Sequence, residues 1–287
     1  MSIELTVLLE NTKQEQSPFE IEHGLSIYVR TNHSTFLFDC GNTGLACSNA
    51  ALMNIDLSKV EFVILSHSHY DHAGGFPSLL RYVTPKTLFT GRNFWCEKFS
   101  FNANDNEYKY RGCDFTEADL SSWNIRQVIC EDIIKLDDEA WLIGNIIRKY
   151  DFETIPKKFV CGENKQQDNF SDEIVLVLRE YDGVAIVTGC AHNGILNIVT
   201  TVGQRLNLPI YSVIGGIHLK GASSERIEKT LTELKNLGVR RLALCHCSGE
   251  EVHKYIKDVV FTDCRISTGS CLNFPPLNAY AFEAGDS

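Results

Sequence analysis

The stretch L-S-H-S-H-Y-D-H-A-G-G, which runs from Leu65 to Gly75, decides the fold. It follows the apolar run Phe62–Leu65, and such a short continuous run is typical of a strand buried on both faces. Four residues of the types that bind metal ions fall within six positions of this stretch: His67, His69, Asp71 and His72. The sequence therefore predicts a metal site at the end of a buried strand.

The spacing within this stretch indicates how the four side chains are used. His67 and His69 lie two residues apart, so in extended backbone both imidazoles point the same way and can bind one ion. Asp71 and His72 are expected where the chain turns into a helix, facing a second ion, and the glycine pair 74–75 is expected to allow a tight turn beneath the ions. These ligand types suit one or two zinc ions, with iron or manganese as alternatives.

Composition and charge limit the classes of function. The 287 residues are 44% hydrophobic and 22% charged, which is ordinary for a globular chain. The net charge of −10, from 27 basic and 37 acidic residues, disfavours a nucleic-acid surface but leaves room for a small anionic substrate. Eleven dispersed cysteines, no basic start with an apolar core and no apolar run of about 18 residues predict a cytoplasmic protein without a membrane span.

The rest of the chain reads as alternating strands and helices. Amphipathic helices are expected over 225–237, capped by Ser223 or Ser224 and ended by Gly238, and over 251–260, with a short helix over 75–82. Strands are expected over 3–9, 25–30, 35–39, 62–65, 173–179, 184–188, 211–214 and 242–245. Residues 91–170 are polar and aromatic, and we expect them to be an insertion that covers the active site within a single domain.

The pattern H-S-H-Y-D-H resembles the H-x-H-x-D-H signature of the metallo-β-lactamase superfamily. Further blocks resemble the branch of 7,8-dihydropterin-6-methyl-4-(β-D-ribofuranosyl)aminobenzene-5′-phosphate synthase: E-N-T at 10–12, E-H-G-L-S at 22–26, L-F-D-C-G at 37–41, T-G-C-A-H-N-G-I at 188–195, G-G-I-H-L at 215–219 and C-H-C-S-G at 245–249. The resemblance implies an α/β fold, a four-layer αβ/βα sandwich of two mixed β-sheets with helices outside. It also implies a metal site at one edge, between the sheets.

The resemblance also implies that residues far along the chain complete two metal sites. Cys190 stands where the superfamily has a bridging aspartate; its thiolate would favour zinc or iron over manganese, and the alternative is a small buried residue. His192 is expected as a ligand, against a capping or core histidine. His246 follows a strand as the last ligand of the superfamily does, and its neighbours Cys245 and Cys247 are expected to pack away from it.

Other residues have less certain roles. The block that usually carries the third histidine is absent, and Asp172 lies near its place, where it would bind or orient a ligand, contact substrate, or be a surface acid. His218 follows the glycine pair 215–216, which is expected to admit a substrate or ion, and His218 is expected to donate a proton or contact phosphate rather than pack in the core. His218 and Asp71 are the two candidates for a catalytic role. His33 and His253 are expected on the surface, and His23 receives no role.

The insertion contains side chains that would select a substrate. Aromatic residues would stack on a flat heterocycle, or else pack the insertion or a contact between copies in a homo-oligomer: Phe94, Trp95, Phe99, Tyr108 and Tyr110. Cations would hold phosphates: Arg92, Lys98, Lys109, Arg111 and Lys220.

Three classes of function fit these observations. The first is a metal-dependent enzyme acting on a phosphorylated or pterin-like small molecule. It would be a hydrolase, or a transferase that joins a pterin methyl diphosphate to a ribofuranosyl aminobenzene phosphate. The second is a di-iron protein that handles electrons or oxygen. The third is a non-catalytic module that binds a metal ion or a ligand.

Overall fold

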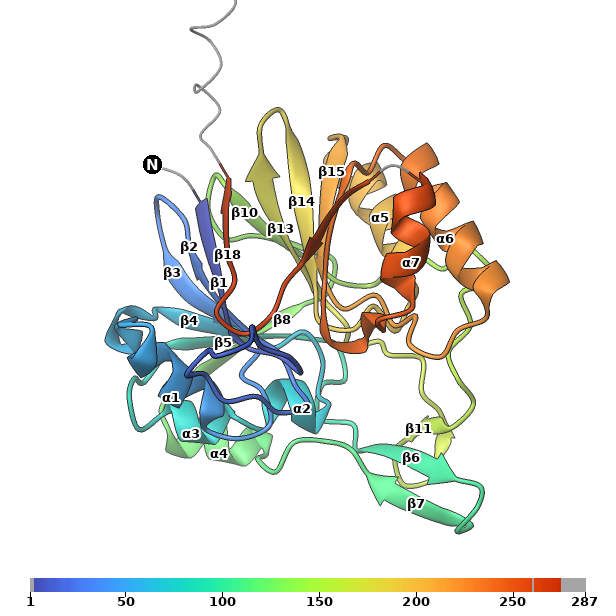
Figure 1. Ribbon diagram of the computed structural model, residues 1–287. Coiled ribbons are helices and arrows are strands. Elements are labelled where there is room, and N and C mark those ends of the chain that lie inside the picture. Colours follow the sequence, from blue (N-terminus) through green and yellow to red (C-terminus); the bar gives the residue numbers. More distant parts are fainter. Residues whose placement is uncertain (1–2, 260, 275–287) are drawn as a thin grey trace, which may run out of the picture.

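Two seven-stranded sheets lie face to face at the centre of the computed structural model, which describes residues 3–259 and 261–274 (Figure 1). The first sheet has antiparallel strands on one side and parallel strands on the other. Its order is β18 (Cys271–Phe274), β1 (Ile3–Leu9), β2 (Ser26–Arg30), β3 (Thr35–Phe38), β4 (Phe62–Ile64), β5 (Thr87–Gly91) and β8 (Arg126–Cys130).

The second sheet is mixed in the same way. Its order is β17 (Thr262–Arg265), β16 (Arg241–Leu244), β15 (Ile210–Gly215), β14 (Gly183–Thr188), β13 (Val175–Glu180), β10 (Ala140–Ile143) and β9 (Ile133–Lys135). Every residue of β14 is buried, as its apolar sequence predicts for a strand covered on both faces.

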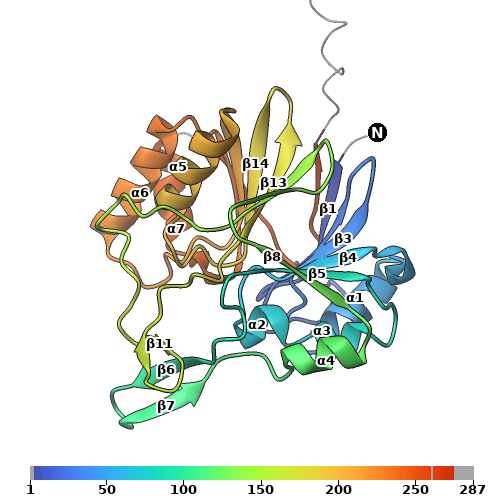
Figure 2. The ribbon, with the colours of Figure 1, turned by 180° about the vertical axis from the view of Figure 1, so that it is seen from behind.

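Helices cover the outer face of each sheet, so the predicted four-layer sandwich of two mixed sheets is confirmed (Figures 1 and 2). Apolar side chains from both sheets fill the space between them, including Leu5 and Ile27 from the first and Leu176 and Ala185 from the second. The second sheet is covered by α5 (Ile195–Leu206), α6 (Ser224–Asn236) and α7 (Val252–Val259). The first is covered by α1 (Leu45–Leu52), α3 (Phe76–Leu79) and α4 (Glu117–Ser122).

The local signals for α6 are confirmed. The Ser223 side chain accepts a hydrogen bond from the Arg226 backbone N–H, and Gly238 follows the helix with φ +93°. Helix α1 was not predicted because its buried residues are mainly small and give no stripe of large apolar side chains. Residue 260, the last of the predicted helix 251–260, lies outside the described residues. In the described part of the chain, no helix has the length and apolar character that a membrane span requires.

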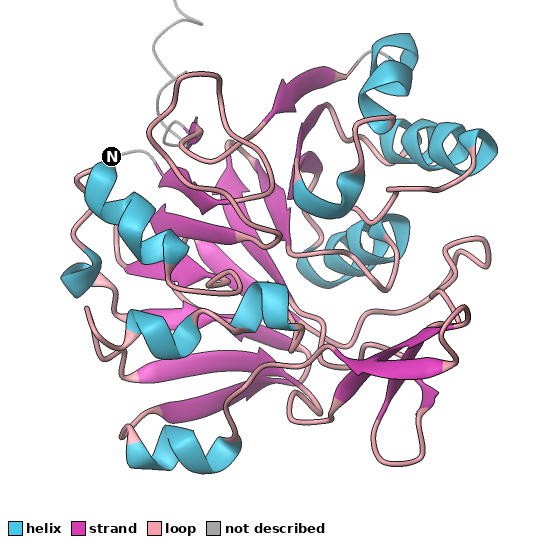
Figure 3. Ribbon diagram, turned by 60° about the horizontal axis from the view of Figure 1, so that its bottom comes forward, coloured by secondary structure: helices cyan, strands magenta, loops and turns pink. Residues whose placement is uncertain are grey.

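A third, small sheet projects from the sandwich (Figures 1 and 3). It consists of β12 (Gln166–Gln167), β11 (Phe159–Cys161), β6 (Lys98–Asn102) and β7 (Glu107–Tyr110). The predicted insertion over 91–170 is therefore wrong in extent, because β8, β9 and β10 within it belong to the two large sheets. Polar loops around these short strands masked their apolar character in the sequence.

Candidate metal centre

The predicted site residues lie in loops that leave the carboxyl ends of strands. Asp39 follows β3, and the segment 67–72 follows β4 and includes the short helix α2 (Tyr70–Ala73). The segment 190–192 follows β14, His218 follows β15, and His246 follows β16 and begins the 3₁₀ turn η2 (His246–Ser248). Because β3 and β4 are parallel, as are β14, β15 and β16, each group of carboxyl ends meets at one edge of its sheet.

A first donor cluster consists of His67, His69 and His192, and all three side chains are buried. Nε2 of His67 lies 3.1 Å from Nδ1 of His69, and a nitrogen of each ring lies within 4.8 Å of the others. Nε2 of His69 and both ring nitrogens of His192 are buried and have no hydrogen-bond partner in the described part of the chain. Such orphaned atoms are costly, so this cluster fits a bound cation.

A second donor cluster consists of Asp71, His72, Cys190 and His246. Nε2 of His72 lies 3.1 Å from Nε2 of His246, and Oδ2 of Asp71 lies 3.7 Å from the first and 3.5 Å from the second. Ligands about 2.1 Å from a tetrahedral ion lie about 3.4 Å from one another, so these separations fit a shared ion.

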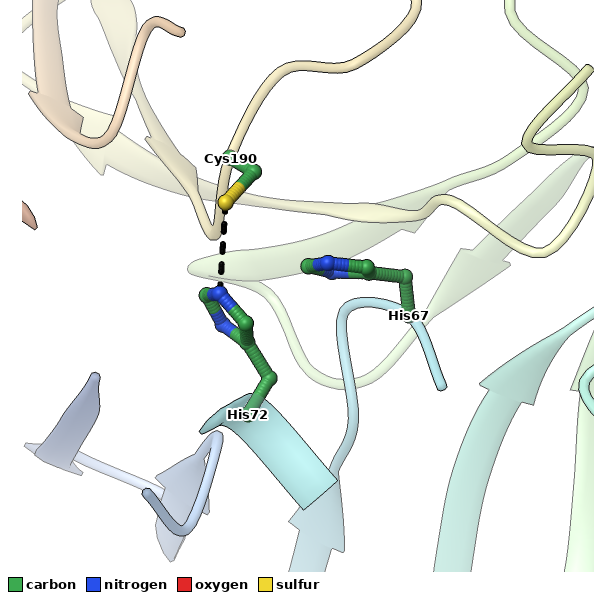
Figure 4. Close-up of side chains that lie close together, drawn as sticks. All are labelled: His67, His72 and Cys190. Atoms are coloured by element: carbon green, nitrogen blue, oxygen red, sulfur yellow. Dashed lines mark hydrogen bonds between the residues drawn. The ribbon is translucent and has the colours of Figure 1, made fainter. Parts of the chain in front are cut away.

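Cys190 closes this second cluster on the side of the second sheet. Its Sγ lies 3.3 Å from Nε2 of His72, and the His67 ring faces the same space (Figure 4). A nitrogen of His67 lies within 4.8 Å of both His72 and Cys190, so the two donor clusters are adjacent. The donor set of imidazole, carboxylate and thiol fits divalent metal ions at both clusters.

Asp39 orients the histidines on the side of the first sheet. Its Oδ2 lies 2.6 Å from Nδ1 of His72, and its carboxylate also accepts hydrogen bonds from the backbone N–H and hydroxyl of Ser66. With the Nδ1–H of His72 donated to this carboxylate, Nε2 is left to bind a metal ion. The Ser66 hydroxyl lies 2.9 Å from Nδ1 of His67, which aims Nε2 of that ring at the first donor cluster.

A buried ion pair supports the loop between His67 and His69. Oδ2 of Asp172 accepts hydrogen bonds from the backbone N–H and hydroxyl of Ser68, each 2.9 Å long. Its Oδ1 lies 2.7 Å from Nζ of Lys98, a cation supplied by the small sheet. Asp172 is fully buried, so it is neither a surface acid nor a substrate contact; its position is that of a residue that orients the ligand loop.

Glu173 supports the other ligand loop. Its carboxylate accepts hydrogen bonds from the backbone N–H groups of His192 and Asn193, at 2.6 and 2.8 Å. Burial raises the pKa of this carboxyl to about 7. Sequence reasoning missed Glu173 because a glutamate at the edge of a strand looks like an ordinary surface residue.

Burial sets the charge of the clustered imidazoles. It lowers the pKa of His69 to about 3 and of His246 to about 4, and it holds those of His67 and His192 well below the usual range. Burial also disfavours charge on His72, but the carboxylates of Asp39 and Asp71 outweigh it and raise its pKa to about 9. Four of the rings are thus neutral at pH 7, the form that binds metal ions.

The donor clusters lie at the base of a cavity of about 510 Å³, within the range of small-molecule sites. Rings of Tyr70, Phe101 and Phe159 form part of its wall. Four cations also line it: Lys109, Arg111, Lys158 and Lys220. This local concentration of positive charge contrasts with the net charge of −10 and favours an anionic ligand.

The structure sorts the predicted substrate residues into two groups. Lys109, Arg111, Lys220 and His218 line the cavity, whereas Arg92 and Trp95 do not. The indole N–H of Trp95 instead donates to Gln127, and Arg92 lies near Glu131 on the surface. The aromatic residues proposed to stack on a substrate, Phe94, Phe99, Tyr108 and Tyr110, lie outside the cavity lining as well.

Lys98 and His253 correct two further predictions. Lys98 is buried against Asp168 and Asp172, so it does not reach a substrate phosphate. His253 is 5% exposed rather than a surface residue, whereas His33 is exposed as expected. His23, which had no predicted role, lines the cavity with Nε2 3.2 Å from Oδ2 of Asp71.

The roles expected for the glycine pairs also need correction. Gly74 and Gly75 have helical φ angles, and they are needed because a Cβ at either would meet a backbone carbonyl at 2.5 Å or less. The space beside Gly215 and Gly216 is filled by protein: a Cβ would lie 2.1 Å from the Thr188 carbonyl oxygen or 2.3 Å from that of Gly189. Neither glycine therefore opens the backbone to a substrate.

Comparisons with known proteins agree with this geometry. The profile of the metallo-beta-lactamase superfamily matches residues 21–88, which include the H-x-H-x-D-H pattern. The chain is 30% identical to 7,8-dihydropterin-6-methyl-4-(beta-D-ribofuranosyl)-aminobenzene-5'-phosphate synthase of Methanocaldococcus jannaschii, over 95% of this chain and 97% of that protein. The chain belongs to the metallo-β-lactamase superfamily. It is an enzyme of that superfamily, whose fold implies divalent metal ions.

Solved structures of the superfamily show the same architecture. Tm1679, described as a metal-dependent hydrolase of the beta-lactamase superfamily, matches with a TM-score of 0.79 and 29% identity, over 94% of this chain and 98% of that one. The metallo-beta-lactamase fold protein YhfI of Bacillus subtilis matches with a TM-score of 0.59 and 11% identity, over 95% of this chain and all of that one, and this likeness concerns the fold alone. In this chain His192 lies beside His67 and His69, so three histidines meet although the sequence block that usually carries a third one is absent.

Proposed function

We propose that this enzyme is a zinc-dependent hydrolase of a small phosphorylated molecule that carries a flat ring. One observation supports it above the others: a single cavity joins two adjacent donor clusters at its base to four cations on its wall. The donor clusters suit zinc, and the cations suit a phosphate group.

Seven metal ligands, three cations and His218 would perform this function. The first ion would be held by His67, His69 and His192, and the second by Asp71, His72, Cys190 and His246. When bound, such ions polarise phosphoryl oxygens and bring the pKa of bound water toward about 7. Arg111, Lys158 and Lys220 would hold the substrate phosphate.

His218 would contribute from the side of the first donor cluster. Its ring centroid lies 4.5 Å from that of His192, and it lines the cavity. Burial, with the nearby charges of Lys158 and Arg226, lowers the pKa of His218 to about 4, so the ring is neutral at pH 7. A neutral imidazole retains one N–H that can donate to a phosphate oxygen, which favours phosphate contact over proton donation as its role.

A second candidate is a transferase that makes a dihydropterin conjugate. The 30% identity to the M. jannaschii synthase over 95% of the chain favours it, and so does the aromatic wall formed by Tyr70, Phe101 and Phe159. The same ligands would serve both reactions, because in the transferase the positive charge would stabilise a departing diphosphate.

The partner we propose is thus a small anionic substrate rather than a nucleic acid or a membrane. We also propose a cytoplasmic location. All eleven cysteines are unpaired, which suits a reducing compartment.

The test uses metal-free protein reloaded with zinc. Phosphate release is measured on a panel of small phosphoesters and diphosphates, and conjugate formation is measured with a pterin methyl diphosphate and a ribofuranosyl aminobenzene phosphate. We expect turnover that requires zinc and falls at least about 100-fold in His67→Ala, with no change in the control His33→Ala. Equal turnover in His67→Ala would refute the proposal, and conjugate formation without phosphate-ester hydrolysis would select the transferase.

A further inference from the structure

Cys247 lies against the second donor cluster, although the sequence predicted that it would pack away from it. Its Sγ, the Sγ of Cys190 and a ring nitrogen of His246 all lie within 4.8 Å of one another. The thiol is unpaired, lies 3.4 Å from the Cys190 carbonyl oxygen and lines the cavity. Two thiols and an imidazole therefore meet at one point of the cavity wall.

The backbone at His246 explains why two adjacent residues both reach this point. On a strand, His246 and Cys247 would face opposite sides. Strand β16 ends at Leu244, however, and His246 has φ +54° at the start of the 3₁₀ turn η2. This left-handed conformation breaks the alternation of side chains that a continued strand would impose.

The neighbouring chain makes room for the second thiol. A Cβ at Gly216 would lie 2.6 Å from Sγ of Cys247 and 3.3 Å from Cα of Cys190. Gly216 is therefore needed so that Cys247 can lie beside Cys190. This gives Gly216 a structural role in place of the predicted role of admitting a substrate.

We propose that Cys247 is a second thiolate ligand of the second metal site, in addition to Asp71, His72, Cys190 and His246. This inference rests on the metal centre of the proposed function. Each thiol loses its proton to solvent as its bond to the metal ion forms. The first site keeps three neutral imidazoles, from His67, His69 and His192.

The two sites then differ in chemistry. Two thiolates neutralise the charge of a divalent ion and select soft ions such as zinc, cadmium and cobalt over magnesium or manganese. An ion bound by three neutral imidazoles would keep its full positive charge and would be the stronger electrophile of the two. The substrate phosphate would therefore engage the first site, which lies beside His218.

Cobalt(II) tests this inference because each cobalt–thiolate bond adds near-ultraviolet charge-transfer absorbance. Metal-free full-length protein is titrated with cobalt chloride, and the spectra of wild type, Cys190→Ser, Cys247→Ser and the double variant are compared. We expect about half of the band to be lost in each single variant and all of it in the double variant. The control Cys271→Ser, an exposed cysteine outside the cluster, should keep the full band.

A second measurement needs no variant. Alkylation of Cys247 in wild-type protein, followed by mass spectrometry, should slow at least about tenfold when zinc is added, whereas alkylation of exposed Cys271 should not change. A cobalt band that keeps its full intensity in Cys247→Ser, or zinc-independent alkylation of Cys247, would overturn the inference while leaving the metal centre in place. Failure of the wild type to bind cobalt at all would overturn the inference and the proposed function together.

Discussion

Nδ1 of His72 lies 2.6 Å from Oδ2 of Asp39, and neither side chain is exposed to solvent. Asp39 itself has φ +60°, which places its carboxylate beneath both His72 and the Ser66 N–H. One carboxylate that follows a strand of the first sheet thus fixes a histidine of the second donor cluster. Asp39, the aspartate of the L-F-D-C-G block, therefore positions His72, a role that the sequence motif alone does not reveal.

Changing Asp39 to asparagine should weaken metal binding without unfolding the protein. Asparagine tolerates the left-handed conformation, but its amide cannot reproduce the charge that holds the Nδ1–H of His72. We expect zinc affinity to fall about 10- to 100-fold in a competition with a chelating dye. Asp138→Asn, at a side chain that is 78% exposed, is the matched control. An unchanged zinc affinity in Asp39→Asn would show that Asp39 does not position His72 for metal binding.

Metal binding should release protons. Although burial opposes it, Asp39 and Asp71 raise the pKa of His72 to about 9, so near pH 7 this ring carries a proton that must leave before Nε2 binds metal. Burial raises the pKa of the Cys190 thiol well above its usual range, so that proton must leave too. Affinity should therefore increase as pH rises from 7 toward 9.

Calorimetry in two buffers with different ionisation enthalpies counts these protons. The buried imidazoles of His69 and His246, with pKa values of about 3 and about 4, should release none near pH 7. Cys190→Ser should reduce the count by about one. An apparent affinity that does not change between pH 7 and 9 would contradict His72 and Cys190 as ligands.

The buried Lys98 should stabilise the fold as well as the site. Burial disfavours its charge, but Asp172 and Asp168 outweigh this and raise its pKa. Its contribution to the free energy of unfolding is therefore fully present below about pH 10 and is lost progressively as the pH rises from there through the raised pKa. Lys98→Met leaves two buried carboxylates without a cation. We expect a loss of about 3–5 kcal/mol in urea denaturation.

Lys135→Met is the matched control for Lys98→Met, since it breaks the exposed pair with Asp138 and should give no measurable change. If both variants unfolded at the same urea concentration as the wild type, the small sheet would not anchor the ligand loop through Asp172.

The cations of the cavity wall should act on substrate binding. Lys158 is exposed on the cavity wall, so Lys158→Met should raise KM about tenfold at low salt and leave kcat nearly unchanged. Added salt should shrink the difference between variant and wild type. Lys235→Met, at the exposed end of α6, is the control, and a fall in kcat alone for Lys158→Met would argue against a simple phosphate contact.

The sequence predicted the elements that carry strong local signals. The run Phe62–Leu65 and the H-x-H-x-D-H pattern placed a strand and a ligand loop correctly, because burial and side-chain direction follow from local spacing. His192 and His246 were expected near the site from the resemblance to the superfamily, and the structure brings both to the donor clusters.

The contacts between distant loops escaped prediction. Glu173, Lys158 and Cys247 reach the site only through the packing of separate strands, which no local pattern encodes. Cys247 was assigned to the wrong side because the strand was assumed to continue through His246, where the backbone instead becomes left-handed. Lys98 was taken for a phosphate contact, and Asp172 was left open between binding or orienting a ligand, contacting substrate and being a surface acid. A buried ion pair and an exposed one look alike in sequence.

Elemental analysis of the freshly purified protein tests the central claim most directly. Wild type, His67→Ala, His72→Ala and the control His33→Ala are compared after gel filtration in metal-free buffer. The account predicts about two zinc ions per chain in wild type and control, and about one or fewer in either ligand variant. A metal content that does not change in His67→Ala and His72→Ala, or a wild type that turns over substrate with no bound metal, would contradict it.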